Sequence, residues 1–381
     1  MEKTQHDGLY IALISLHGLI RGENPELGRD ADTGGQVQYV LDLSRALAEH
    51  PDVARVDLMT RQILSTNVGY EYGEPLEQIA DRAWIVRLPF GPHRYLYKEN
   101  LWPYLPHFVD QALVHFRGVG RIPDVVHGHY ADAGEGASRI ARLLDLPVVF
   151  TGHSLGRVKE QRLLDKGLSA EVIEERYHIS RRIEAEEIAL DRADLVVTST
   201  IQEIEEQYAM YRTGARKRMA VIPPGVDLSR FRPPRRGERF EVASKIDRFL
   251  QKPKKPMVLA LPRPDERKNL ETLIQAFGES ETLRDLANLV LVIGTRDNVE
   301  SMPKAQRFAT PATGVHGNHN ALKGLYVAYA SGSGIVAAGF DNLVEDCVVH
   351  DVGWFGTIEH AGIAVRPYKQ DRTQSTVGHC T

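Results

Sequence analysis

Cysteine is scarce in this 381-residue chain, which contains two, Cys347 and Cys380, both near its C-terminal end. They cannot form a disulfide framework for the main body of the protein, and their rarity fits a reducing compartment, so we expect a cytoplasmic location. Their spacing with His350 and His379 matches no familiar set of zinc ligands. We therefore expect no metal site.

Long apolar runs and an excess of one charge are also lacking. No segment approaches the roughly 18 apolar residues that a membrane helix needs. The polar residues 1–7 lead directly into a strand pattern, which does not resemble a signal peptide. The net charge of −4 provides no general attraction to nucleic acid or to an anionic membrane. We expect neither kind of partner, and the sequence is silent on oligomeric state.

The length and composition indicate a globular protein of two domains. A chain of 381 residues is longer than a single hydrophobic core usually supports. Its apolar fraction of 42% and charged fraction of 26% are those of a soluble globular protein. The proline- and arginine-rich stretch at residues 231–237 has the chemistry of a linker. We therefore place a domain boundary between residues 230 and 231.

Short apolar runs alternate with amphipathic helical patterns along most of the chain. This alternation is typical of an α/β protein built on a parallel sheet. The predicted strands cover residues 9–15, 56–60, 84–88, 123–130, 146–150, 193–200, 219–222, 256–261 and 289–294. The predicted helices begin near residues 32–36 and 202, and include residues 105–116, 177–190 and 273–277.

The loop after the first strand leads into the sequence DTGGQ at the start of a helical pattern. Gly34 and Gly35 would let backbone N–H groups approach a ligand, and the first turn of a helix favours an anion. They are therefore a candidate seat for a phosphate, and Gln36 could hydrogen-bond a sugar hydroxyl beside it. The alternative is a helix start that only needs small residues, with Asp32 or Thr33 as its N-cap.

Histidines follow two neighbouring strands of the predicted sheet. His129 lies at the end of the strand at residues 123–130, and His153, next to Ser154, follows the strand at residues 146–150. The carboxyl ends of parallel strands meet at one edge, where open α/β sheets bind their ligands. We therefore place His153 in the site and His129 in a loop that faces it, although a single histidine is more often a structural residue.

Several lysine and arginine side chains lie at positions where they could bind phosphate groups. Lys98 lies in an aromatic loop, and Arg181 and Arg182 lie in a predicted helix, where ordinary solvation or helical ion pairs would also explain them. Arginine can grip phosphate with two hydrogen bonds. Arg263 and Lys268 follow the first strand of the second domain, and they could hold a diphosphate from the opposite side of an interdomain cleft.

Six motifs in combination closely resemble sucrose-phosphate synthase, over about residues 8–302. They are DTGGQ at residues 32–36, TGHSLG at 151–156, RRIEAEE at 181–187, TSTIQEI at 198–204, PPGVD at 223–227 and RPDERKNL at 263–270. Sucrose synthase, a relative of this family, shares the Gly-Gly-Gln loop but typically differs in sequence around the histidine.

The resemblance implies a GT-B fold of two Rossmann-like domains and retaining transfer of glucose from UDP-glucose to fructose 6-phosphate. It implies no cofactor, and Mg²⁺ is not indicated. Cations at the departing diphosphate would stabilise the transition state, whereas no paired carboxylates support a hydrolase. By motif, the acceptor and the donor diphosphate are lined by Gly34, Gly35 and Gln36, and the glucosyl unit is contacted by His153, with His129 and Ser154 beside it. The acceptor phosphate is bound by Lys98, Lys159 and one or both of Arg181 and Arg182. The departing UDP is neutralised by Arg263 and Lys268.

The resemblance ends near residue 302. Residues 303–381 show weak periodicity and lack the Asn-Pro and Glu-Pro-Phe-Gly region expected in the second half of a donor domain. We expect residues 231–302 to be the start of a nucleotide-sugar-binding domain, followed by a tail that is either frame-shifted or divergent. Such an incomplete domain predicts weak binding of fructose 6-phosphate and little or no transferase activity. Sucrose synthase activity and an inactive sugar-phosphate-binding remnant are the alternatives.

Overall fold

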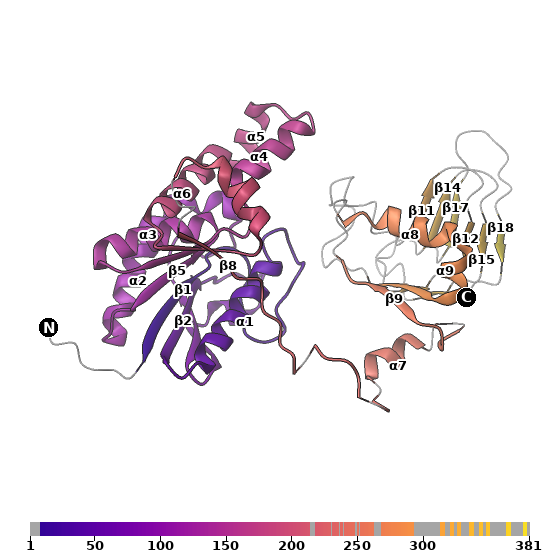
Figure 1. Cartoon of the computed structure of the whole chain (residues 1–381), viewed down its shortest axis with the longest axis horizontal. Helices are drawn as coiled ribbons and strands as arrows, with labels where there is room; N and C mark the ends of the chain where they lie inside the picture. The colour runs from indigo at the N-terminus through magenta and orange to yellow at the C-terminus, as the bar shows by residue number, and fades with distance from the viewer. Residues whose placement is uncertain are drawn as a thin grey trace. The chain divides into compact units, whose positions relative to one another are not determined.

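The chain forms two compact units, Met1–Leu228 and Ser229–Thr381, which are described separately below (Figure 1). The computed structural model describes residues 8–213 and most of 218–292, namely all but residues 230, 236, 239, 248–249, 251, 263–267. Beyond residue 292 it describes the backbone of eight short strands between residues 313 and 378. The division between the units lies next to the boundary predicted from the linker-like sequence.

The first unit is built on one eight-stranded sheet with the order β3-β4-β2-β1-β5-β6-β7-β8. All neighbouring strands are parallel except β3, which pairs with β4 in the antiparallel sense. The strands are β1 (Leu9–Ile14), β2 (Val53–Arg61), β3 (Leu76–Ala80), β4 (Ala83–Leu88), β5 (Val125–His129), β6 (Val148–Thr151), β7 (Leu195–Thr198) and β8 (Met219–Val221).

Helices cover both faces of this sheet (Figure 1). Successive side chains of a strand point to opposite faces, so the uninterrupted apolar run of β1 serves two cores. Tyr10, Ala12 and Ile14 are buried in the core that includes α2 and α3, whereas Ile11 and Leu13 pack in the core that includes α1. The helices are α1 (Gly35–Glu49), α2 (Leu105–Val119), α3 (Ala131–Leu144), α4 (Gly156–Asp165), α5 (Ala170–Tyr177) and α6 (Ile179–Arg192).

The strand order reverses its direction at β1. From β1 the chain continues to β2 on one side of the sheet, and later to β5 and β6 on the other side. Loops that leave neighbouring strands in opposite directions open a crevice at the carboxyl ends of those strands, and ligands of open α/β sheets bind there. The topology therefore predicts a site at the carboxyl ends of β1, β5 and β6.

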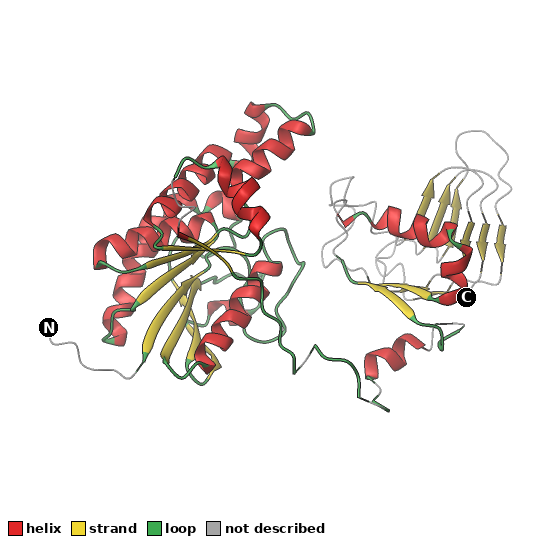
Figure 2. Ribbon diagram, viewed as in Figure 1, coloured by secondary structure: helices red, strands yellow, loops and turns green. Residues whose placement is uncertain are grey.

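The second unit contains a parallel pair of strands, β9 (Met257–Ala260) and β10 (Asn288–Leu291), joined by α8 (Leu270–Glu279) and α9 (Glu281–Leu286) (Figure 2). A short helix, α7 (Glu241–Asp247), precedes them. This strand–helix–strand unit agrees with the α/β pattern that the sequence predicts for the start of the second domain.

Short strands recur beyond residue 292 without a Rossmann-like alternation among the described segments. Each of the first five pairs in parallel with the strand three positions further along the chain, so that three small sheets have the orders β11-β14-β17, β12-β15-β18 and β13-β16. This recurrence is the strand order of a parallel β-solenoid. The strands are β11 (Thr313–His316), β12 (Ala321–Lys323), β13 (Tyr326–Ala328), β14 (Ile335–Ala338), β15 (Leu343–Glu345), β16 (Val348–His350), β17 (Ile363–Arg366) and β18 (Thr376–Gly378).

The four residues weighed as zinc ligands lie in this region. Cys347, His379 and Cys380 lie outside the described residues, and only the backbone of His350 is described. The sequence-based judgement on them stays a prediction.

Candidate active site

The residues predicted to bind ligand in the first unit gather at the carboxyl edge of the sheet. His129 is the last residue of β5, His153 lies two residues after the end of β6, and Gln36 lies in the first turn of α1. The Gln36 side-chain amide donates to the Ser15 hydroxyl, which follows β1, over 3.1 Å and to the backbone carbonyl of His129 over 3.5 Å. Gln36 thus links the ends of the two strands on either side of the topological switch.

The first turn of α1 is open. Gly34 is the N-cap residue, and it has no side chain that could cap the helix. A Cβ atom built on Gly34 or Gly35 would have no described atom within 4 Å. The alternative N-caps from the sequence are wrong, because the Thr33 hydroxyl accepts the backbone N–H of Leu19 and Asp32 binds Lys98. The helix start therefore presents unobstructed backbone N–H groups.

Three imidazoles lie against one another at the ends of β5 and β6, and we call them the histidine stack: His127, His129 and His153. The ring centroids of His127 and His129 are 4.0 Å apart, and His129 Nδ1 lies 3.0 Å from His153 Nε2. Burial lowers the pKa of His127 to about 3 and the pKa of His129 well below its usual value, helped by the neighbouring rings. His153 is exposed on one side, and the protein packed around its other side lowers its pKa to about 4. All three rings are therefore neutral at pH 7.

His153 occupies a strained turn. Its φ angle is 56°, in the left-handed region, and the backbone N–H of Ser154 donates to the carbonyl of Gly152 over 2.6 Å. This is a three-residue γ-turn of the rare kind with positive φ at its centre. Such strain persists where the surrounding structure holds it, and it concentrates at functional sites.

Two acid–base pairs, of which the sequence indicated only Lys98, lie beside the start of α1. His17 Nδ1 and the buried Asp132 carboxylate are 2.8 Å apart. Burial alone would lower the pKa of His17, but the charge and hydrogen bond of Asp132 outweigh it and raise the pKa. Asp32 accepts the backbone N–H of Lys98 over 2.9 Å and binds its ammonium group. Although burial opposes it, the charges of His17 and Lys98 lower the pKa of Asp32.

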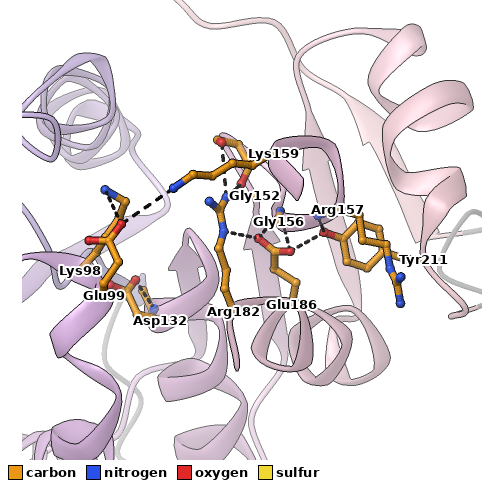
Figure 3. Close-up of polar contacts among 12 residues, drawn as sticks. Lys98, Glu99, Asp132, Gly152, Gly156, Arg157, Lys159, Arg182, Glu186 and Tyr211 are labelled. Carbon is orange, nitrogen blue, oxygen red and sulfur yellow. Dashed lines mark hydrogen bonds and ion pairs between the residues drawn. The ribbon is translucent and has the colours of Figure 1, made fainter. Parts of the chain in front are cut away.

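Glu99 lies between two ammonium groups. Its carboxylate is 3.4 Å from Lys98 Nζ and 3.9 Å from Lys159 Nζ, as Figure 3 shows. Burial acts to lower the pKa of both lysines, but their net shifts differ. Asp32 and Glu99 outweigh burial and raise the pKa of Lys98, whereas burial and the nearby Arg182 lower the pKa of Lys159 to about 8. The region thus collects positive charge, and two carboxylates, Asp32 and Glu99, already pair with Lys98 there.

Arg182 is a buried cation held by α6. Its Nε donates to Glu186 over 3.0 Å, and its terminal nitrogen donates to the Ser154 carbonyl over 2.5 Å and to the Ser154 hydroxyl over 3.3 Å. The Glu186 carboxylate also accepts the backbone N–H of Gly156 and the Tyr211 hydroxyl (Figure 3). A Cβ on Gly156 would lie 2.8 Å from that carboxylate, so only glycine fits. This network ties the turn containing Ser154 to α6.

The neighbouring Arg181 lies elsewhere. Its guanidinium donates to the buried Glu135 over 2.5 Å and to Glu184 over 3.2 Å, and it lies over the ring of Trp102. The structure therefore brings Arg182, and not Arg181, to the turn at Ser154. The sequence left open whether one or both arginines bind phosphate.

The other two predicted cations belong to the second unit. Lys268 is exposed two residues before α8, and Arg263 lies outside the described residues. Their roles toward a diphosphate stay predictions.

Sequence reasoning missed His17, Asp132, Glu99 and Glu186. One signal in the sequence could have identified His17. It lies three positions after β1, and so near the carboxyl end of a strand, as His129 and His153 do for β5 and β6. The three carboxylates carry no such local signal.

Within the described part of the chain, no three histidine, cysteine or acidic side chains are grouped to hold a metal ion. The helices described there are also too short or too polar to cross a membrane.

The chain is similar to known proteins in sequence. A family model described as the sucrose synthase first GT-B domain matches residues 8–220. A probable sucrose-phosphate synthase 1 of Oryza sativa subsp. indica is 46% identical over 363 aligned positions, which cover 79% of this chain and 34% of that protein. The sucrose-phosphate synthase of Spinacia oleracea is 46% identical over 357 positions, with 77% and 34% covered. The chain thus spans about a third of the length of these curated relatives.

The same likeness extends to solved structures. Sucrose-phosphate synthase from Thermosynechococcus elongatus is matched with a TM-score of 0.59 and 26% identity, over 79% of this chain and 66% of that one. The catalytic domain of starch synthase IV from Arabidopsis thaliana, bound to ADP and acarbose, matches with a TM-score of 0.52 and 15% identity, over 79% and 70%. The second match concerns the fold alone. The predicted GT-B fold and the predicted resemblance are confirmed, and the chain belongs to the family of the sucrose synthase GT-B domain, with sucrose-phosphate synthases among its relatives.

Proposed function

We propose that this chain is a hexosyltransferase of the sucrose-phosphate synthase type, which transfers glucose from UDP-glucose to fructose 6-phosphate and forms sucrose 6-phosphate. The first unit binds the acceptor at the carboxyl edge of its sheet. The transferred glucosyl unit lies against His153, and the donor diphosphate approaches the first turn of α1.

The observation that carries this proposal is the group of cations around Glu99. Lys98 and Lys159 both lie within 4 Å of its carboxylate, and Arg182 is close enough to lower the pKa of Lys159. A sugar phosphate carries close to two negative charges at neutral pH and offers several acceptor oxygens. Ammonium and guanidinium groups bind such oxygens through charge-assisted hydrogen bonds. An acceptor without a phosphate would leave these cations paired with the protein's own carboxylates alone.

The chemistry fits the remaining parts of the site. Breaking a glycosyl–phosphate bond develops negative charge on the leaving diphosphate and positive charge on the sugar. Fixed donors stabilise the former without reorganisation during the reaction. The open N-terminal turn of α1 offers such donors, because Gly34 and Gly35 have no side chain to block their N–H groups. The role that the resemblance gives Arg263 and Lys268, neutralisation of the departing UDP, belongs to the same proposal.

Calorimetric titration of the full chain tests the acceptor half of this proposal. Fructose 6-phosphate should bind, fructose should bind at least tenfold more weakly, and Lys98→Met should reduce the difference. Equal binding of the two sugars would refute the phosphate site and favour sucrose synthase activity, which the matched family model also keeps open.

Formation of sucrose 6-phosphate from UDP-glucose tests the enzyme. One further candidate is a sugar-phosphate-binding protein without transferase activity, which is favoured because residues 303–381 lack the Asn-Pro and Glu-Pro-Phe-Gly region expected in a donor domain. That candidate predicts binding of fructose 6-phosphate, no binding of UDP and no product. Product formation would refute it.

A further inference from the structure

One nitrogen of the histidine stack has no partner. His129 is fully buried, and its Nε2 accepts or donates no hydrogen bond among the described residues. Its other nitrogen, Nδ1, is 3.0 Å from His153 Nε2. The hydrogen bond between His129 Nδ1 and His153 Nε2 therefore uses a single proton, which is bonded to one of these two nitrogens.

The neutrality of the rings decides how many protons there are. Burial keeps the pKa of each ring below its usual value, so each imidazole carries one proton at pH 7. If His153 Nε2 were the donor, the single proton of His129 would have to sit on its buried Nε2. A buried N–H group without an acceptor is costly and rare in native proteins. If His129 Nδ1 is the donor, no N–H group is left unpaired in the interior.

The geometry points to His129 as a positioning residue: we propose that its Nδ1–H donates to His153 Nε2 and so holds His153 in the tautomer that carries its proton on Nδ1. This inference rests on the proposed function, in which His153 faces the transferred sugar. The lone pair of His153 Nε2 is then occupied, and the ring offers the ligand a donor. It can hydrogen-bond a sugar oxygen, but in this arrangement it cannot accept a proton from a hydroxyl as a general base.

The backbone of His129 supports the same assignment of role. Its carbonyl accepts from Gln36 over 3.5 Å, so one residue is in contact with two predicted ligand-binding side chains. The strained turn at His153 gives a reason why a second group is needed. A ring on a left-handed residue of a surface loop is held in one orientation only if something fixes it. Tyr39 packs edge-on against the His153 ring, with centroids 4.9 Å apart, and His129 contacts its Nε2.

Nitrogen NMR of the full chain, labelled with ¹⁵N-histidine and without ligand, tests the proposal. The His153 signals are assigned from their absence in His153→Gln. We expect a protonated Nδ1 and an unprotonated Nε2 in the native protein. His129→Leu should convert His153 to a mixture of tautomers, while His129→Asn, whose amide can donate from nearly the same place, should restore the native pattern.

A protonated His153 Nε2 in the native protein would overturn the proposal, and so would a native tautomer pattern in His129→Leu. Should His129→Leu fail to fold, the native spectrum and His129→Asn decide the matter by themselves. The tautomer measurement needs no ligand, so it is separate from the proposed function. Native tautomers without binding of fructose 6-phosphate would refute the function and leave the positioning role intact. Conversely, binding of fructose 6-phosphate with a protonated Nε2 would refute the positioning role alone.

Discussion

Replacing Glu186 with leucine should destabilise the protein strongly, because three donors lose their acceptor at once. The carboxylate is fully buried and accepts from the backbone of Gly156, from the Tyr211 hydroxyl and from Arg182. Burial raises the pKa of Glu186, but the guanidinium beside it requires a countercharge. In Glu186→Leu, Arg182 remains a cation that is 4% exposed and has no ionic partner among the described residues.

The expected loss follows from that unpaired charge. Breaking a buried ion pair by removing one partner costs about 3–5 kcal/mol, which includes the desolvation that is no longer offset. The Gly156 N–H and the Tyr211 hydroxyl add to the loss where no water replaces the carboxylate, at about 1–3 kcal/mol for an unsatisfied group. We therefore expect a loss of about 4 kcal/mol or more, a large part of the 5–15 kcal/mol that is roughly typical of a folded protein.

Urea unfolding of the full chain, followed by tryptophan fluorescence, measures this loss. Two of the three tryptophans, Trp84 and Trp102, lie in the first unit and report on it. Glu187→Leu is the matched control. Glu187 is the next residue of α6 and pairs with Arg157 over 3.0 Å at the partly exposed surface, so its loss should cost about 1 kcal/mol or less.

A double variant separates the charge effect from packing. In Glu186→Leu combined with Arg182→Leu, no charge is left unpaired, so stability should partly recover relative to Glu186→Leu. The reasoning is refuted if Glu186→Leu costs under about 1 kcal/mol, or if the double variant is less stable than the single one.

Three further predictions concern ligand binding and pH. Gly35→Ala should leave the free energy of unfolding within about 1 kcal/mol of the native value, because the added Cβ meets open space; it should weaken UDP binding at least tenfold in calorimetry, and unchanged binding would contradict the phosphate seat. The pKa of Lys159 is lowered to about 8, so affinity for fructose 6-phosphate should fall as the pH rises through that value; Lys159→Arg, which stays charged, should remove the fall, and a fall of the same size in the variant would exclude Lys159 as its cause. The histidine stack has lowered pKa values in the folded state, so stability should be fully present above about pH 6.5 and be lost as the pH falls below it, where the unfolded chain takes up protons first. Urea unfolding at several pH values measures this loss. His17 has a raised pKa, so its own contribution to stability is lost only as the pH rises above about 6.5.

The sheet was largely predictable because its strands are strongly apolar. Runs such as β1 and β6 are buried on both faces, and that leaves a continuous signal in the sequence. The antiparallel strand β3 was missed, since Glu77 and Gln78 interrupt its apolar residues and its side chains are exposed or half-exposed. The helix predicted from residue 202 is instead interrupted by a π-helical segment, Glu203–Gln207, for which the sequence gives no local signal.

The site was predictable where topology alone brings residues together. His129 and His153 end neighbouring parallel strands, so their proximity follows from the strand order. Partners such as Glu99 and Glu186 were not predictable, because nothing in their local sequence shows which distant cation they meet. Asp32 illustrates the same limit: its local sequence favours an N-cap, but the ammonium of Lys98 is a stronger partner for a buried carboxylate.

The empty space in front of Gly35 also offers a place for a reporter group. A label attached through Gly35→Cys would start from a Cβ atom with no described atom within 4 Å. The native thiols, Cys347 and Cys380, lie far along the sequence and could be replaced first. Because the label would occupy the proposed phosphate seat, loss of diphosphate binding in the labelled protein would report on that seat in an assay that requires no turnover.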